Sequence, residues 1–351
     1  MLYRIRRHRL MLMTIGILLW ILSGWMPAES QTRPLNVVAT VPELGSLARE
    51  IGGGQVEVTV IAKGTEDPHF VEARPSFIKA VSQADVFIQM GMEMEVGWAP
   101  VLLQQSRNPN VQPGRHGFID AAKVISPLGV PTGTIDRSMG DVHAAGNPHY
   151  LLDPLRGLQV AKYLRDQFTA LRPAERAVFT QRYTDFRQRL GTGLVGAELA
   201  SLYDFEKLAR LFAHGKLVAF LESQNQAHLL GGWFGAMVPL IGTKVVGDHD
   251  MWQYFAERFR FDVVGLMEPK PGVPPTTRHL KSLIQTMNAQ NVSLILTGAY
   301  YDPRHARFLA QNSSGKVAPM AHQVDARPGT GDYLSMIDYN INQFVTVLNN
   351  G

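Results

Sequence analysis

The chain has 351 residues, of which 45% are hydrophobic and 18% are charged, and its formal net charge is +4. This composition excludes disordered and fibrous proteins and is that of a globular protein. The length exceeds a single typical core and predicts two domains. The sequence contains no cysteine, which excludes disulfides and thiolate metal ligands.

The first thirty residues have the composition of a secretory signal. A basic start, a long apolar run and a small-x-small pattern follow one another, namely Arg4, Arg6, Arg7 and Arg9, then 10–25, then Ala28 to Ser30. We therefore expect a signal peptide at 1–30, cleaved near Ser30, and a protein that is free in the periplasm because no cysteine follows for lipid attachment. A retained anchor is the alternative, although the apolar run is short for a membrane span. Most of the positive charge lies in this segment, so nothing argues for a nucleic-acid partner.

The first half alternates between β and helical patterns. Strands are predicted at 35–40, 56–61 and 84–90, and helices at 42–51, 75–82, 93–105 and 155–171. This alternation predicts a mostly parallel sheet with flanking helices, in an N-terminal α/β lobe over 31–172.

A long amphipathic helix is predicted from 174 to about 202, where Phe179, Tyr183 and Phe186 recur at helical spacing. Gly191, Gly193 and Gly196 weaken this helix and predict a kink. Its place in the middle of the chain indicates a linker between two lobes, over 173–202.

The second half repeats the alternation and predicts a C-terminal α/β lobe over 203–351. Strands are expected at 243–247, 261–267, 292–297 and 316–319, and helices at 251–259, 275–289, 303–311 and 331–349. Residues 203–242 give no firm signal, and 216–221 fits a strand or a helix. The predicted fold class is thus α/β, with two lobes joined by one long helix.

A loop at 140–154 carries two histidines, His143 and His149, among glycines and prolines that preclude regular structure. Pro148 restricts the residue before it to extended conformations, which stiffens the approach to His149. Asp153 and Pro154 have the positions of an N-cap and a first helical residue. A stiff loop that presents imidazoles beside a helix start suits metal capture better than core packing.

Three further segments place histidines after predicted strands, where ligands collect in parallel α/β folds. His69 follows the second strand, His249 lies between a strand and a helix, and His322 comes after the last strand together with Asp325. No two of these residues form a compact motif such as His-Glu-x-x-His, so spacing alone is only suggestive of a shared site.

Taken together, these segments resemble the periplasmic substrate-binding proteins of zinc and manganese ABC transporters (the ZnuA/TroA type, cluster A-I). The resemblance covers the chain from about Leu35 to its end. The segments that carry it, in order, are 35–40, Asp67 to His69, Gly146 to His149 with Asp153 and Pro154, 245–255, Glu268 to Gly272 and Asp332 to Asn340.

The resemblance implies that a metal ion lies in the cleft between the lobes. It maps the ligands onto His69, His149, His249 and Asp325, with His322 as the rival for the fourth position and His143 as an accessory contact at best. Imidazole donors suit zinc, whereas carboxylate-rich sites suit manganese. We therefore expect Zn²⁺ more than Mn²⁺. Asp67, Asp248, Asp250 and Glu268 are candidates for orienting the imidazoles, or else are solvated loop carboxylates.

The resemblance predicts a monomeric carrier that captures a divalent metal in the periplasm and delivers it to the membrane permease of an ABC importer. A manganese-binding homologue is the alternative. A zinc-dependent hydrolase is a further alternative, but it needs an open coordination position and a general base. The chain has no zinc-protease motif, nucleophile elbow or phosphate-binding loop, so we expect no enzyme and no catalytic residues.

Overall fold

The structure is a computed structural model that describes residues 33–133, 143–270 and 272–349. The predicted signal peptide lies outside these residues. Within them, no helix is both long and apolar enough to cross a membrane.

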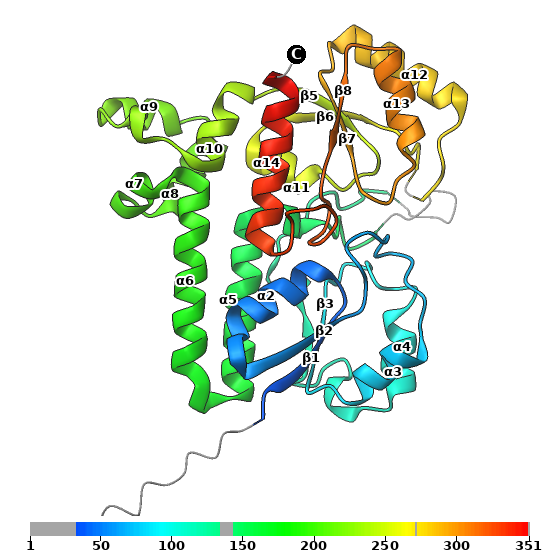
Figure 1. The fold of residues 1–351 in the computed structure, drawn as a ribbon, viewed down its shortest axis with the longest axis vertical. Coiled ribbons are helices and arrows are strands. Elements are labelled where there is room, and N and C mark those ends of the chain that lie inside the picture. Colours follow the sequence, from blue (N-terminus) through cyan, green and yellow to red (C-terminus); the bar gives the residue numbers. More distant parts are fainter. Residues whose placement is uncertain (1–32, 134–142, 271, 350–351) are drawn as a thin grey trace, which may run out of the picture. The chain divides into compact units, whose positions relative to one another are not determined.

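Two four-stranded parallel sheets form the centres of the two halves (Figure 1). The strand orders are β2-β1-β3-β4 and β6-β5-β7-β8, so the first strand of each half lies inside its sheet and the second lies at an edge. Leu35 of β1 pairs with Val56 of β2, and Val37 pairs with Val86 of β3. The strands are β1 (Leu35–Ala39), β2 (Val56–Val60), β3 (Val86–Gln89), β4 (Phe118–Asp120), β5 (Lys244–Gly247), β6 (Asp262–Leu266), β7 (Leu294–Thr297) and β8 (Lys316–Pro319).

Helices cover both faces of each sheet, which explains why the inner strands are mostly apolar. Val37 of β1 packs into one core with α2, whereas its neighbour Val38 faces a second core beneath α3 and α4. The helices of the first half are α2 (Pro42–Gly52), α3 (Pro75–Ser82), α4 (Ala99–Ser106) and α5 (Pro154–Leu171). Those that flank the second sheet are α11 (Gln253–Phe259), α12 (Thr277–Gln290), α13 (Pro303–Gln311) and α14 (Tyr333–Asn349).

The predicted long helix is present as α6 (Arg176–Val195), which packs against α5, and it ends earlier than expected. Gly196 has a φ of +86°, and α7 (Ala197–Leu202) begins directly after it. A Cβ at Gly196 would lie 3.2 Å from the Cα of Gly231, so glycine is required both by its backbone angle and by this close approach. The predicted kink is therefore a break between two helices.

Residues 203–242 fold as short helices and add no strand to either sheet. Asp204 caps α8 (Phe205–Ala213) by accepting hydrogen bonds from two main-chain N–H groups. The segment 216–221, which fitted a strand or a helix, belongs to α9 (Leu217–Ser223), and α10 (Gly232–Met237) follows.

Two sequence-based assignments in the first half differ from the structure. The helix predicted at 93–105 begins only at Ala99, because the carboxylate of Glu95 accepts hydrogen bonds from the N–H groups of Met90 and Gly91 and folds 91–98 into turns. The short strand β4 was not predicted. It pairs with β3 over three residues and is too short to show a pattern.

One hydrophobic core runs through both halves. It contains Leu44 of α2, Leu164 of α5, Leu194 of α6, Leu296 of β7 and Phe344 of α14. The fold class predicted from the sequence, two α/β lobes joined by a long helix, is confirmed. Residues 35–351 cluster as one compact unit, so the lobe boundaries at 172 and 202 stay a prediction.

Candidate metal centre

Three of the four predicted ligand residues lie together. His69, His149 and His249 each direct a ring nitrogen to one spot, where these atoms lie within 4.8 Å of one another. The ring centroids are 5.3 Å, 5.7 Å and 5.5 Å apart, so the rings form an almost equilateral triangle. Two nitrogens at 2.1 Å from a tetrahedral zinc ion are about 3.4 Å apart. The triangle is therefore of the size that one ion can bridge.

His69 lies in the loop after the edge strand β2. The carboxylate of Asp67 accepts a hydrogen bond from the main-chain N–H of His69 at 3.0 Å, and it lies 2.8 Å from Nδ1 of the same residue. The indole of Trp98 donates to the carbonyl of Pro68 and holds the loop from beneath. Asp67 thus fixes the ring so that Nε2 points toward the other two histidines.

His149 lies on a loop that is bonded to the second half of the chain. Tyr254 of α11 donates a hydrogen bond to the carbonyl of Asn147 at 2.8 Å and accepts one from the N–H of Leu128 at 2.9 Å. Asn147 also accepts from the main-chain N–H of His149. The stiffness predicted from Pro148 is therefore reinforced by contacts that the sequence does not reveal.

An ion-pair network extends this attachment. Asp153, which caps α5, is fully buried and receives two hydrogen bonds from the guanidinium of Arg258, at 2.7 Å and 2.9 Å. Arg156 donates to both Asp153 and Glu257. We call Tyr254, Arg258, Asp153 and Arg156 the α5–α11 clamp, since they hold the segment that carries His149 against α11.

His249 follows the inner strand β5 almost directly. Its Nδ1 lies 2.9 Å from the carboxylate of Glu268, which comes after β6. The other two candidate carboxylates bond elsewhere. Asp248 accepts from the N–H of Gly298, and Asp250 accepts from the amide of Gln253. Asp67 and Glu268 are thus the carboxylates that contact the ring nitrogens of the triangle.

The two less certain histidines contact different residues. Nε2 of His143, at the start of the described part of its loop, is 3.2 Å from Nε2 of His69, and the two rings are stacked. His322 follows β8 and is 6% exposed, and neither of its ring nitrogens makes a hydrogen bond with a described residue. Its ring contacts Tyr300 edge-on.

Asp325 does not belong to the group of close ligand atoms, although the resemblance placed the fourth ligand there. It is exposed, has a φ of +61°, and donates its main-chain N–H to the carbonyl of Thr330. The turn from Asp325 to Thr330 therefore holds the main chain of this residue, while the side chain remains exposed to solvent. Asp325 as a ligand stays a prediction.

Burial shapes the electrostatics of the site. It lowers the pKa of His149 well below its usual range, with the charges of His69 and His249 as smaller causes. It likewise lowers the pKa of His322 to about 4, against the opposing influence of Glu66 and Asp67. For Asp67, burial acts to raise the pKa, but the hydrogen bonds with His69 and the charges of His69 and His249 together outweigh it, and the net shift is downward. Neutral imidazoles beside ionised carboxylates are the state that binds a divalent cation.

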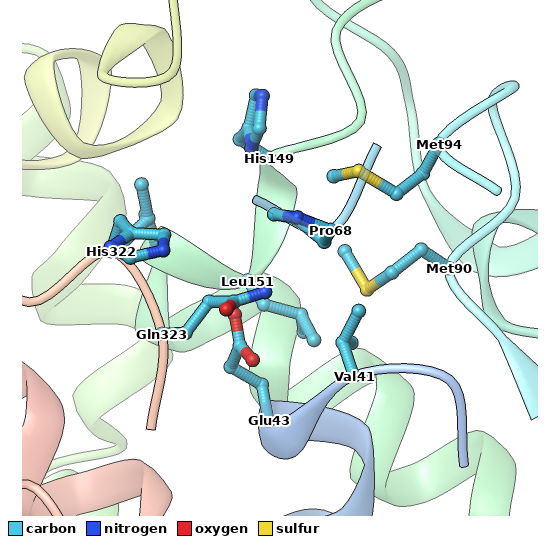
Figure 2. A pocket seen from close by; sticks show the side chains of 10 residues that line it. Val41, Glu43, Pro68, Met90, Met94, His149, Leu151, His322 and Gln323 are labelled. Carbon is cyan, nitrogen blue, oxygen red and sulfur yellow. The ribbon is translucent and has the colours of Figure 1, made fainter. Parts of the chain in front are cut away.

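Sequence reasoning missed Glu43. It lies in the first turn of α2, where an acidic residue usually faces solvent and stabilises the helix N-terminus, so nothing distinguished it. In the structure Glu43 is 5% exposed and lines a small chamber of about 10 Å³ that also contacts His149 and His322 (Figure 2). We call this space the inner chamber.

Comparison with known proteins agrees with the fold. The family model described as "Zinc-uptake complex component A periplasmic" matches residues 37–193 and 234–347. The chain belongs to this family. The unmatched stretch between the two ranges coincides with α7, α8 and α9, which identifies these short helices as the part that departs from the family pattern.

Curated relatives match over almost the whole chain. The manganese-binding lipoprotein MntA of Halalkalibacterium halodurans is 22% identical, over 90% of this chain and 88% of the relative. The zinc-binding protein TroA of Treponema pallidum is 20% identical, over 93% and 92%. A crystal structure of ZnuA superposes with a TM-score of 0.63 at 18% identity and covers 90% of this chain and 98% of that one. This structural likeness shows a shared fold.

Family membership confirms the prediction of a substrate-binding component of a metal ABC transporter, a class that faces the outside of the cell or the periplasm. The relatives are named for zinc and for manganese, so they do not favour one metal over the other. That choice depends on the donor atoms of this chain.

Proposed function

We propose that this protein captures Zn²⁺ in the periplasm and delivers it to the membrane permease of an ABC importer. The observation that carries the proposal is the triangle of His69, His149 and His249, whose ring nitrogens lie within 4.8 Å of one another. Three imidazoles form a nitrogen-rich site that suits zinc, whereas manganese prefers carboxylate and water oxygens. Manganese is the alternative cargo, because one of the relatives is named for it.

The carboxylates around the triangle support this choice. Asp67 and Glu268 each contact Nδ1 of a triangle histidine, at 2.8 Å and 2.9 Å. A carboxylate on the second ring nitrogen fixes the tautomer, so that Nε2 carries the lone pair, and it makes that nitrogen a stronger ligand. Two negative charges also offset the charge of a divalent ion in a buried site.

We propose His322 as the fourth ligand in preference to Asp325. Both ring nitrogens of His322 are buried without a hydrogen-bonding partner among the described residues, and His322 lines the inner chamber that His149 also lines. Asp325 is exposed, whereas His322 is buried, and both lie outside the group of close ligand atoms. His143 is an accessory contact from the outer side, since it reaches His69 alone.

A site closed by four protein ligands stores a metal and leaves no position for an activated water. We therefore propose a monomeric carrier without catalytic activity. The continuous core and the α5–α11 clamp oppose wide separation of the lobes, so release to the permease involves a local loss of ligands.

The test is elemental analysis of the protein purified from the periplasm, in parallel for wild type and His249→Ala. We expect about one zinc per chain in the wild type and a loss of at least about 100-fold in affinity in the variant, because removing a ligand costs more than removing its orienting partner. His214→Ala, an exposed histidine of the second half, is the control and should keep its zinc.

Manganese in place of zinc in the wild type would identify the alternative cargo. Unchanged metal content in His249→Ala would refute the site. Hydrolytic turnover by the zinc-loaded protein would refute the carrier.

A further inference from the structure

The inner chamber holds a buried carboxyl group that no part of the proposed metal site uses. Glu43 rises from the first turn of α2 into the chamber, and its Oε2 has no hydrogen-bonding partner among the described residues (Figure 2). A buried polar atom without a partner destabilises the fold. The space of about 10 Å³ is about as large as one water molecule needs, and Glu43 and His322 both line it.

The other polar side chains of the chamber are few, and two of them are already engaged. Met90, Met94 and the remaining walls are apolar. Gln323 reaches the carbonyl oxygens of Lys63 and Glu66 with its amide nitrogen. His149 belongs to the triangle. His322 is left, and both of its ring nitrogens lack a partner among the described residues.

Two histidines of the triangle have a carboxylate on their second ring nitrogen, and Glu43 and His322 would form the same kind of pair. His69 has Asp67 on its second nitrogen, and His249 has Glu268. His322 has no such carboxylate in hydrogen-bond contact, but Glu43 faces the same chamber. An imidazole that binds a metal through one nitrogen usually donates its other N–H to a carboxylate or carbonyl group.

We propose that Glu43 is the positioning residue of His322: when His322 binds the metal through one ring nitrogen, Glu43 accepts a hydrogen bond from the other. This inference rests on the proposed function, because it takes His322 as the fourth ligand. A residue of α2, the first helix of the first lobe, would then orient a ligand that the second lobe supplies. Each lobe would then hold a ligand of the other in place, since α11 already fixes the segment of His149.

The test is a double-mutant cycle on Zn²⁺ affinity, measured by competition with a chelator for Glu43→Leu, His322→Ala and the double variant. Leucine suits the apolar walls of the chamber, so the fold should be retained, which a thermal melt checks. We expect Glu43→Leu to weaken binding by about 10- to 100-fold. In the His322→Ala background the same change should have almost no further effect, because its partner is gone.

Two further variants separate positioning from packing. Glu43→Gln keeps an acceptor oxygen and should recover part of the lost affinity. Glu50→Gln removes the same charge from the same helix, at a site that pairs with Arg189 outside the chamber, and should bind zinc as the wild type does. The visible spectrum of bound Co²⁺ should change in Glu43→Leu, since the fourth ligand is displaced, and should remain unchanged in Glu50→Gln.

Wild-type affinity in Glu43→Leu would overturn the inference, and so would an equal loss in both backgrounds. His322→Ala with full affinity would also overturn it and leave the zinc carrier standing. A wild-type protein that binds no zinc at all would instead refute the proposed function.

Discussion

The two lobes contain the same sheet, four parallel strands in the same order, yet they fix their histidines by different means. In the second lobe, His249 lies almost directly after the inner strand β5, and Glu268 after the neighbouring strand contacts its ring. In the first lobe, His69 comes after a longer loop beyond an edge strand. His149 is farther still from any strand of its own sheet and depends on α11 of the second lobe.

This difference shows that a strand end and a loop require different support to hold a ligand. Directly after a strand, the sheet itself fixes the main chain, and one carboxylate is enough to orient the ring. On a loop, other contacts must replace the sheet. For His149 these contacts are the α5–α11 clamp, in which Tyr254 and Arg258 of the second half bond to Asn147 and Asp153 of the first half, and Arg156 bonds to Glu257.

The largest effect should come from breaking the ion pairs of the clamp. Arg258→Met removes both hydrogen bonds from Arg258 to Asp153, a fully buried carboxylate that then keeps Arg156 and the main-chain N–H of Leu155 as partners. We expect the free energy of unfolding to fall by about 3 kcal/mol, because a buried charge loses one of its two cationic partners. Chemical denaturation of the metal-free protein measures this change.

The matched control is Arg165→Met, which removes a surface ion pair with Asp166 and should cost less than about 1 kcal/mol. Equal losses in the two variants would mean that the clamp is no stronger than a surface pair. The contrast between His249, which the sheet holds, and His149, which the α5–α11 clamp holds, would then be wrong.

A smaller effect, which depends on pH, is expected from Glu43 in α2, the helix that follows β1 of the first lobe. Burial raises the pKa of Glu43 from 4.5 to about 8, with a main-chain hydrogen bond opposing the shift. Between these values the folded chain keeps a proton that the unfolded chain has lost, so the stability of the metal-free wild type falls as the pH rises through this window.

Glu43→Gln abolishes this titration. The melting temperature of the metal-free variant, relative to the wild type, should therefore increase by roughly 3–6 °C between pH 5 and pH 8.5. Thermal melts at several pH values in the presence of a chelator measure it. A difference that is constant with pH would show that the carboxyl group of Glu43 is not shifted by burial.

The smallest effect should follow from Tyr254→Phe. This change removes the hydroxyl that bonds Asn147 and Leu128, and it leaves the ion pairs of the clamp in place. We expect a loss of about 1–2 kcal/mol in stability and a zinc dissociation rate that rises severalfold, because His149 is held less firmly. Stopped-flow release of zinc into a chelator measures the rate, and an unchanged rate would show that the loop is stiff without Tyr254.

Much of the architecture was predictable because it depends on short-range patterns. Helices α3 and α13 and strand β8 have the predicted bounds, since prolines at their ends and local apolar spacing determine them. The long helix was found as well, but its break at Gly196 is set by the close approach of Gly231 from a distant part of the chain. Strand β4 was not predicted because its three residues are too few to show the alternation of apolar and polar residues that marks a strand.

The candidate site divides in the same way. The sequence by itself determined the strand–helix alternation, and with the family resemblance it selected His69, His149 and His249, because strand ends and the loop signals around Pro148 are recognisable local settings. Only the tertiary structure decided that Asp325 is exposed while His322 is buried, that α11 holds the loop of His149, and that Glu43 faces inward. These features depend on which surfaces meet when two lobes share one core, and no local pattern in the chain records that.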